Sequence, residues 1–179
     1  MGSYEGQAAK EMFNMDVFGR QFALRTVHLT SAVSTFIFAM VYGVIEHTLL
    51  TSPLGISILV HPLSVHLIGQ IYFYHVLMFV LAVLISFNPF FDILFFSSTR
   101  VLKKQALLWG TGNIVNFIWL EDLFYWVPFG EWPKDMMTPL HLSFYGIVWW
   151  YPVALLSASI LYYLTINSMR KMKTREALP

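Results

Sequence analysis

Residues Asn113–His141 read NIVNFIWLEDLFYWVPFGEWPKDMMTPLH, and this stretch decides how the rest of the chain is interpreted. It begins as an apolar helix and then places Glu121 and Asp122 side by side inside the hydrophobic segment. It breaks at Pro128 and restarts at Pro139. Carboxylates are costly in lipid, so their presence within an apolar segment needs a reason.

The composition is that of a membrane protein. The chain has 179 residues, of which 57% are hydrophobic and only 12% are charged, whereas a soluble domain is about 25% charged. Its mean hydropathy is +0.61. A net charge of +1 with no basic face argues against nucleic acid as a partner, and the absence of cysteine excludes disulfides and thiolate metal sites. We therefore expect a multi-pass protein of the plasma membrane, in contact with the lipid bilayer.

Four apolar segments are long enough to span a bilayer, since a transmembrane helix needs about 20 mostly apolar residues. The fold class predicted is all-α: an integral-membrane four-helix bundle that forms a single domain over residues 1–179. Pro152 is expected to kink the last helix. The predicted spans cover about residues 22–50, 63–87, 105–127 and 139–166.

Two segments outside these spans mix apolar and charged residues. Residues 8–20 alternate apolar and charged side chains, which predicts a short N-terminal helix lying in the membrane interface, with a loosely ordered tail as the alternative. Asn88 and Pro89 are expected to end the second span. Residues 90–104 begin apolar and end basic, which indicates a short interfacial piece followed by a cytoplasmic loop.

Basic residues indicate the orientation of the bundle. Ten of the eleven lysines and arginines fall before or in the first turn of the first span, between the second and third spans, or after the fourth; the remaining one is Lys134. Cytoplasmic loops carry the excess of Lys and Arg. Both termini are therefore predicted to be cytoplasmic, and residues 51–62 and 128–138 to lie outside.

This topology brings acidic and histidine side chains from all four spans to the outer end of the bundle. In the first span, Glu46 ends a stripe of small and polar residues that includes Ser31 and Thr35 and should face other helices. His66, with Gln70 and Tyr74, is expected on one face of the second span. Carboxylate and imidazole without thiolate suit copper, zinc or iron. The candidate metal ligands are Glu46, His47, His66, Glu121, Asp122 and His141.

Each of these residues also has a structural interpretation. Glu121 or Asp122 could pair with Lys134 or with Trp and Tyr donors. Only one of the two adjacent side chains is expected to face the core, because they point about 100° apart. Glu46 could be an ordinary residue at a helix end. His28 and His75 lie away from the predicted cluster and are expected to be structural.

Two local resemblances bear on function. The run Trp119–Trp126, followed by Trp132-Pro133 and His141, resembles small uncharacterised prokaryotic multi-span membrane proteins over about 30 residues. Separately, Lys134–His141 resembles the Asp…Thr-Pro-x-His segment in the C subunit of copper membrane monooxygenases, the methane and ammonia monooxygenases. There the histidine is a metal ligand, which implies this role for His141. The chain lacks the Asp-x-x-x-His element that precedes that ligand in the family.

These observations leave several functions open. The first hypothesis is a small subunit of a membrane-embedded oxidoreductase complex, such as an accessory subunit of a copper membrane monooxygenase, with other membrane subunits as partners and copper, zinc or iron at the cluster. The second is a stand-alone metal-dependent membrane enzyme. The third is a structural or lipid-binding subunit without metal, whose polar residues only hold the helices together.

Overall fold

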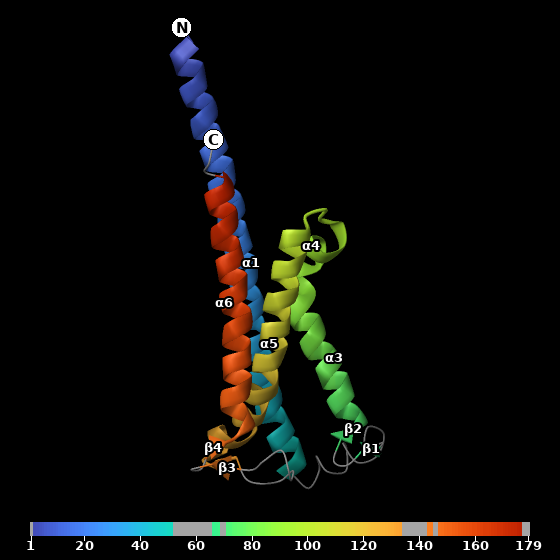
Figure 1. Ribbon diagram of the computed structural model, residues 1–179. Helices are drawn as coiled ribbons and strands as arrows, with labels where there is room; N and C mark the ends of the chain where they lie inside the picture. The colour runs from blue at the N-terminus through green and yellow to red at the C-terminus, as the bar shows by residue number, and fades with distance from the viewer. Residues whose placement is uncertain (1, 52–65, 69–70, 134–142, 145–146, 177–179) are drawn as a thin grey trace.

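The computed structural model describes residues 2–51, 66–68, 71–133, 143–144 and 147–176, and the side chains of residues 23–51, 73–133 and 147–172. Four long helices, α1, α3, α5 and α6, run alternately up and down and pack together (Figure 1). The elements are α1 (Gly2–Thr51), β1 (His66–Ile68), β2 (Ile71–Tyr72), α3 (Phe73–Phe87), the 3-10 turn η1 (Asn88–Phe90), α4 (Phe91–Phe96), α5 (Arg100–Trp126), the 3-10 turn η2 (Val127–Phe129), β3 (Ser143–Phe144), β4 (Ile147–Val148) and α6 (Trp150–Glu176).

The bundle has two distinct ends. At one end, α1 and α5 finish and α3 and α6 begin, next to the short antiparallel hairpins β1–β2 and β3–β4; we call this the loop end (Figure 1). The start of α1 and the finish of α6 lie at the opposite end, the terminus end. The two ends of the chain therefore approach the same side of the bundle, as the distribution of basic residues predicts.

Among the described residues, three helical segments are long and apolar enough to cross a membrane: Ala23–Thr51, Phe73–Phe96 and Trp150–Met172. The chain is thus a multi-pass membrane protein by the length and composition of its helices. The remaining long helix, α5, has 27 residues, or about 40 Å at 1.5 Å per residue. It is long enough to span, but it does not reach the hydropathy of the other three.

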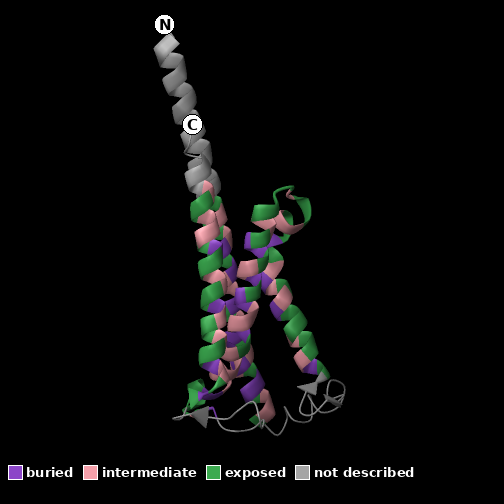
Figure 2. Cartoon of the chain, in the orientation of Figure 1, coloured by how far each residue is buried: buried purple, intermediate pink, exposed green. Residues whose placement is uncertain are grey.

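The position of α5 explains its composition. It packs against α1, α3 and α6, so part of its polar surface faces protein instead of lipid. Gln105 and Asn113 are buried on it, and Gly110 and Gly112 allow close packing of neighbouring side chains. Figure 2 shows buried positions concentrated between α1, α5 and α6, while the outer faces are exposed. The apolar core beside them consists of Ala39, Ala82, Phe117 and Leu120.

The predicted second span is displaced by about ten residues. The helix begins at Phe73, because the residues before it form the hairpin in which His66 pairs with Tyr72. It also does not stop at Pro89: the 3-10 turn η1 carries the chain directly into α4, which ends at Phe96. A proline in a first turn leaves no internal hydrogen bond unmade, so the apolar run continues through it. The interfacial segment expected from residue 90 is therefore the last part of this helical span.

Two other boundaries also differ from the prediction. Residues 8–20 do not form a separate short helix: they belong to α1, which continues without a break from Gly2. The fourth span was expected from residue 139, but α6 begins at Trp150, after the strand pair β3–β4. Pro152 therefore falls in the first turn of α6, where a proline is tolerated, and it does not kink the helix interior.

Candidate functional site

The polar stripe of α1 faces the interior of the bundle, as its helical spacing predicts. Ser31, Thr35 and Ala39 are fully buried, and Glu46 at the end of the stripe is 7% exposed. One residue in this stripe region is a glycine for a steric reason. A Cβ atom on Gly43 would lie 2.4 Å from the backbone oxygen of Glu121 and 2.9 Å from the backbone nitrogen of Tyr125. Gly43 thus lets α1 approach the backbone of α5 directly.

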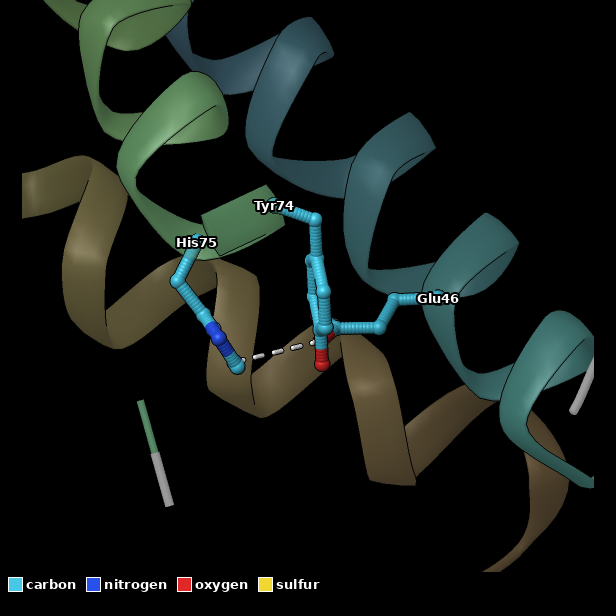
Figure 3. A network of polar contacts seen from close by, with 3 residues as sticks. All are labelled: Glu46, Tyr74 and His75. Atoms are coloured by element: carbon cyan, nitrogen blue, oxygen red, sulfur yellow. Dashed lines mark hydrogen bonds and ion pairs between the residues drawn. The ribbon is translucent and has the colours of Figure 1, made fainter. Parts of the chain in front are cut away.

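This close approach places Glu46 between α3 and α5. The hydroxyl of Tyr74 donates a hydrogen bond of 2.9 Å to Oε1 of Glu46. The Nε2 atom of His75 lies 3.7 Å from the same oxygen, close enough for an ion pair when the imidazole is protonated. Both partners come from the first turn of α3 and reach toward α1 (Figure 3). His75, expected to be structural and remote from the cluster, is therefore part of it.

Glu121 lies within hydrogen-bonding reach of Glu46, so two carboxyl groups from α1 and α5 adjoin each other. A hydrogen bond between two carboxyl groups requires a proton on one of them. Among the described residues, neither group has a Lys or Arg partner, and Glu46 can form an ion pair with His75. The hydroxyl of Tyr42 is buried beside the same two carboxyl groups. We call Glu46 and Glu121 the carboxyl pair.

Asp122 belongs to a different contact. It accepts a hydrogen bond of 2.5 Å from the hydroxyl of Tyr151 on α6. Glu121 and Asp122 are adjacent on α5 and point to different neighbours, α1 and α6, as expected for positions about 100° apart on a helix. The acidic dipeptide therefore ties the last turns of α5 to two other helices, and only its first residue joins the carboxyl pair.

His47 also points away from the pair. Its ring stacks on Phe129 with the centroids 3.8 Å apart and meets the edge of Tyr125 at 4.9 Å. The side chain is 7% exposed, and its Nδ1 atom is buried without a hydrogen-bond partner. Because His47 follows Glu46 by one position, it lies in an aromatic cage on a different side of α1 and does not join the carboxyl pair.

The remaining predicted ligands are not placed in the site. His141 and the side chain of His66 lie outside the described residues. The backbone of His66 is in β1, so the expected helical face with Gln70 and Tyr74 is not formed. Within the part of the chain that the structure describes, no three His, Asp or Glu side chains are arranged to hold a metal ion. Of the six predicted ligands, the structure brings Glu46 and Glu121 together.

A second polar region, nearer the terminus end, contains no charge. It is a run of hydrogen bonds in which each donor has an acceptor, and it crosses all four long helices. We call it the asparagine chain. It runs from Trp119 Nε1 to Asn116 Oδ1 (2.9 Å), Asn116 Nδ2 to Tyr162 (2.8 Å), Tyr162 to Asn113 Oδ1 (2.7 Å), Asn113 Nδ2 to Ser31 (2.6 Å) and Ser31 to the carbonyl of Ser86 (2.7 Å).

Sequence reasoning missed most of the partners of the acids. The sequence placed Tyr74 on a face with His66 and indicated aromatic donors for Glu121 or Asp122 without identifying them; the hydroxyls of Tyr74 and Tyr151 bind Glu46 and Asp122. The Tyr74–Glu46 contact could have been predicted from a tyrosine in the first turn of a helix next to a buried acid. That prediction requires knowing that α3 begins at Phe73.

Comparison with known proteins gives no relative for this chain: no family model, no curated protein and no solved structure matches it.

Proposed function

We propose that this chain is a four-span subunit of a larger membrane-embedded oxidoreductase complex, and that its carboxyl pair binds a cation near the outer face of the membrane. In this proposal α5 is the fourth span, shielded from lipid by α1, α3 and α6. Both termini are cytoplasmic, and the loop end with Glu46 and Glu121 faces outward.

The observation that carries the proposal is the presence of two adjoining carboxyl groups, one buried (Glu46) and one half-buried (Glu121), without a Lys or Arg partner among the described residues. A charged side chain within a span costs roughly 2.5–3.5 kcal/mol on insertion scales. Holding helices together does not require that cost here, because the asparagine chain already connects α1, α3, α5 and α6 without charge. A bound cation is the simplest compensation for the negative charge.

The donor set fits a transition metal in part. Carboxylate oxygens and imidazole nitrogens suit copper, zinc or iron. Glu46 and Glu121 supply two carboxylates, and His75 supplies one imidazole. Because these three are not arranged as a metal site by themselves, a further protein ligand has to come from outside the described side chains, with His66 and His141 as candidates. The resemblance of Lys134–His141 to the copper monooxygenase segment supports copper and an accessory role in such a complex.

The test is native mass spectrometry combined with elemental analysis of the protein purified in mild detergent. The proposal expects bound metal and co-purifying membrane subunits in the wild type, and at least tenfold less metal in Glu46→Gln and in Glu121→Gln. Asp92→Asn is the matched control, because Asp92 is an exposed carboxylate on α4 at the other end of the bundle. Wild-type protein without metal in complexes isolated at neutral pH contradicts the metal proposal.

A specific observation also favours a second function, a structural subunit without metal. The asparagine chain and the tyrosine–carboxylate contacts already connect all four long helices by hydrogen bonds, without a metal. In that case Glu46→Gln and Glu121→Gln leave metal content and partner binding as in the wild type. A monomeric protein that retains metal would instead indicate a stand-alone metal-dependent enzyme.

The proposed orientation is tested by single cysteines in this cysteine-free chain. Cysteines at Ser52 and Lys134 are expected to react with a membrane-impermeant thiol reagent added outside intact cells, and one at Ser98 only after permeabilisation. The reverse pattern would contradict the orientation, and equal reaction at Ser98 and Lys134 would contradict α5 as a span.

A further inference from the structure

An apolar groove lies on the surface of the bundle between α1 and the α3–α4 segment. It has a volume of about 1130 Å³ and is lined almost wholly by apolar side chains. Small-molecule sites usually measure about 300–1000 Å³, so the groove is large enough for a lipid-sized ligand. On α1 it runs from Thr30 to Val41, and on the other side from Val83 to Phe95, with Leu107 of α5 also contributing.

The length of the groove matches one leaflet of a bilayer. Thr30 and Val41 are eleven residues apart, or about 16 Å along a helix at 1.5 Å per residue. The hydrocarbon core of a bilayer is about 30 Å thick, so one leaflet contributes about 15 Å. A partner helix that crossed the membrane would need a groove along the full height of the bundle. The groove instead stops at Val41 on α1, ten residues before that helix ends, and on the other side it covers only the half of Phe73–Phe96 nearer the terminus end.

The end of the groove next to the terminus end is basic. Arg100, Lys103 and Lys104 precede Leu107 by seven, four and three residues, so they lie on the same side of α5 as the groove-lining leucine. Arg25 precedes Thr30 on α1 and is exposed. None of these four cations makes an ion pair among the described residues; the acid in the same region is Asp92, which is exposed on α4.

We infer that the groove binds a phospholipid with an anionic headgroup, whose phosphate contacts Arg100, Lys103 and Lys104 and whose acyl chains lie between α1 and α3. The cytoplasmic leaflet carries the anionic lipids, and basic pockets between transmembrane helices on that side bind their headgroups. The exposed rings of Phe91, Phe95 and Phe96 on α4 precede the basic residues in the chain and offer apolar surface to acyl chains. This inference does not depend on the carboxyl pair, which lies toward the loop end.

The test is competitive lipid binding measured by native mass spectrometry on full-length protein from nanodiscs that contain equal amounts of phosphatidylglycerol and phosphatidylcholine. The wild type is expected to retain phosphatidylglycerol preferentially. Lys103→Gln/Lys104→Gln should reduce this preference on the order of 25-fold, about fivefold for each charge near a membrane surface. Arg170→Gln/Lys171→Gln removes two basic residues from α6 at the same end, away from the groove, and should change the preference less than threefold.

A second pair of variants tests the groove itself. Ser34→Leu fills it, because Ser34 is a lining residue, and should lower the retention of both lipids several-fold. Ser157→Leu is the control, since Ser157 lies on α6 and only bonds the carbonyl of Val153. Equal retention of the two lipids by the wild type overturns the inference. An equal loss of preference in Arg170→Gln/Lys171→Gln also overturns it, because the preference would then come from diffuse surface charge. Dimerisation that Ser34→Leu abolishes overturns it as well, because a second copy of the chain would then occupy the groove.

Discussion

The asparagine chain and the carboxyl pair are two solutions to the same problem, polar side chains between membrane helices. In the asparagine chain, each donor from Trp119 to Ser31 has an acceptor, and no residue is charged. In the carboxyl pair, Glu46 and Glu121 adjoin each other, and their nearby donors are Tyr74 and His75. The first region pairs its groups completely, whereas the second concentrates negative charge.

The difference indicates what each region is for. A neutral, fully paired network fixes the relative positions of α1, α3, α5 and α6, since every rearrangement leaves a buried polar group unpaired. A pair of carboxyl groups is a poor device for the same purpose, because it needs a proton or another cation to be stable. The following changes separate the two roles, beginning with the largest expected effect.

The largest effect is expected from placing a charge in the neutral region. Asn113→Asp keeps the shape of the side chain but removes the amide that donates to Ser31, and should lower the free energy of unfolding by about 3 kcal/mol, the cost of a carboxylate inside a span. Reversible unfolding in mixed micelles, titrated with sodium dodecyl sulfate, measures it. A loss below about 1 kcal/mol would contradict the view that this region is a neutral lock.

The next effect concerns the helix approach that creates the carboxyl pair. Gly43→Ala forces a methyl group against the backbone of α5 at Glu121 and Tyr125, and should cost about 2 kcal/mol, within the range for overpacking. Gly110→Ala, near the asparagine chain, is the matched control, because the atoms nearest to its methyl group belong to the ring of Phe87, a side chain that can move. The same unfolding titration should show a smaller loss for Gly110→Ala; the opposite order would contradict the role of Gly43.

A smaller effect is expected from removing one donor to the carboxyl pair. Tyr74→Phe deletes the hydroxyl that bonds Glu46 and should lower the unfolding free energy by about 1 kcal/mol, near the values measured between membrane helices. Tyr163→Phe on α6 is the control, because Tyr163 is 64% exposed and should show no measurable change. Equal stability of Tyr74→Phe and the wild type would mean that the hydroxyl contributes nothing to holding Glu46.

The smallest effect on stability is expected from neutralising the pair itself. Glu121→Gln retains a hydrogen-bonding group beside Glu46 and removes a neighbouring negative charge, so the unfolding free energy should stay unchanged or rise by up to about 1 kcal/mol. Glu121→Gln replaces an acid by an amide in the charged region, whereas Asn113→Asp replaces an amide by an acid in the neutral region. A loss above about 2 kcal/mol in the metal-free protein would show that the carboxylate itself is a structural element.

Several features of the fold could be predicted because they follow from local rules. The hydropathy of residues 23–51 and 150–172 identifies membrane helices by composition alone, and Pro128 correctly predicts the end of α5. The buried stripe through Ser31, Thr35 and Glu46 follows from helical spacing. The start of α3 could not be predicted in the same way, because residues 63–72 are apolar enough to continue the helix that follows, and only pairing between His66 and Tyr72 shows that a hairpin comes first.

The site was predicted less completely, for a related reason. That Glu46 and Glu121 would converge followed from the number and direction of the spans. The pairing of Asp122 with Tyr151 and of Glu46 with His75 depended on rotations of α5 and α3 about their axes, which apolar composition does not specify.

The sequence by itself determined that this chain is a helical membrane protein with a polar stripe directed inward. In lipid the backbone must form its hydrogen bonds within a helix, and the helical spacing of polar side chains decides which face turns away from the lipid. Only the tertiary structure decided which polar residues meet. Hydrogen bonds between helices depend on atomic distances that are set by close contacts such as Gly43 against the backbone of α5. The same contact that brings the two carboxyl groups together leaves His47 in its aromatic cage, although the sequence places it directly beside Glu46.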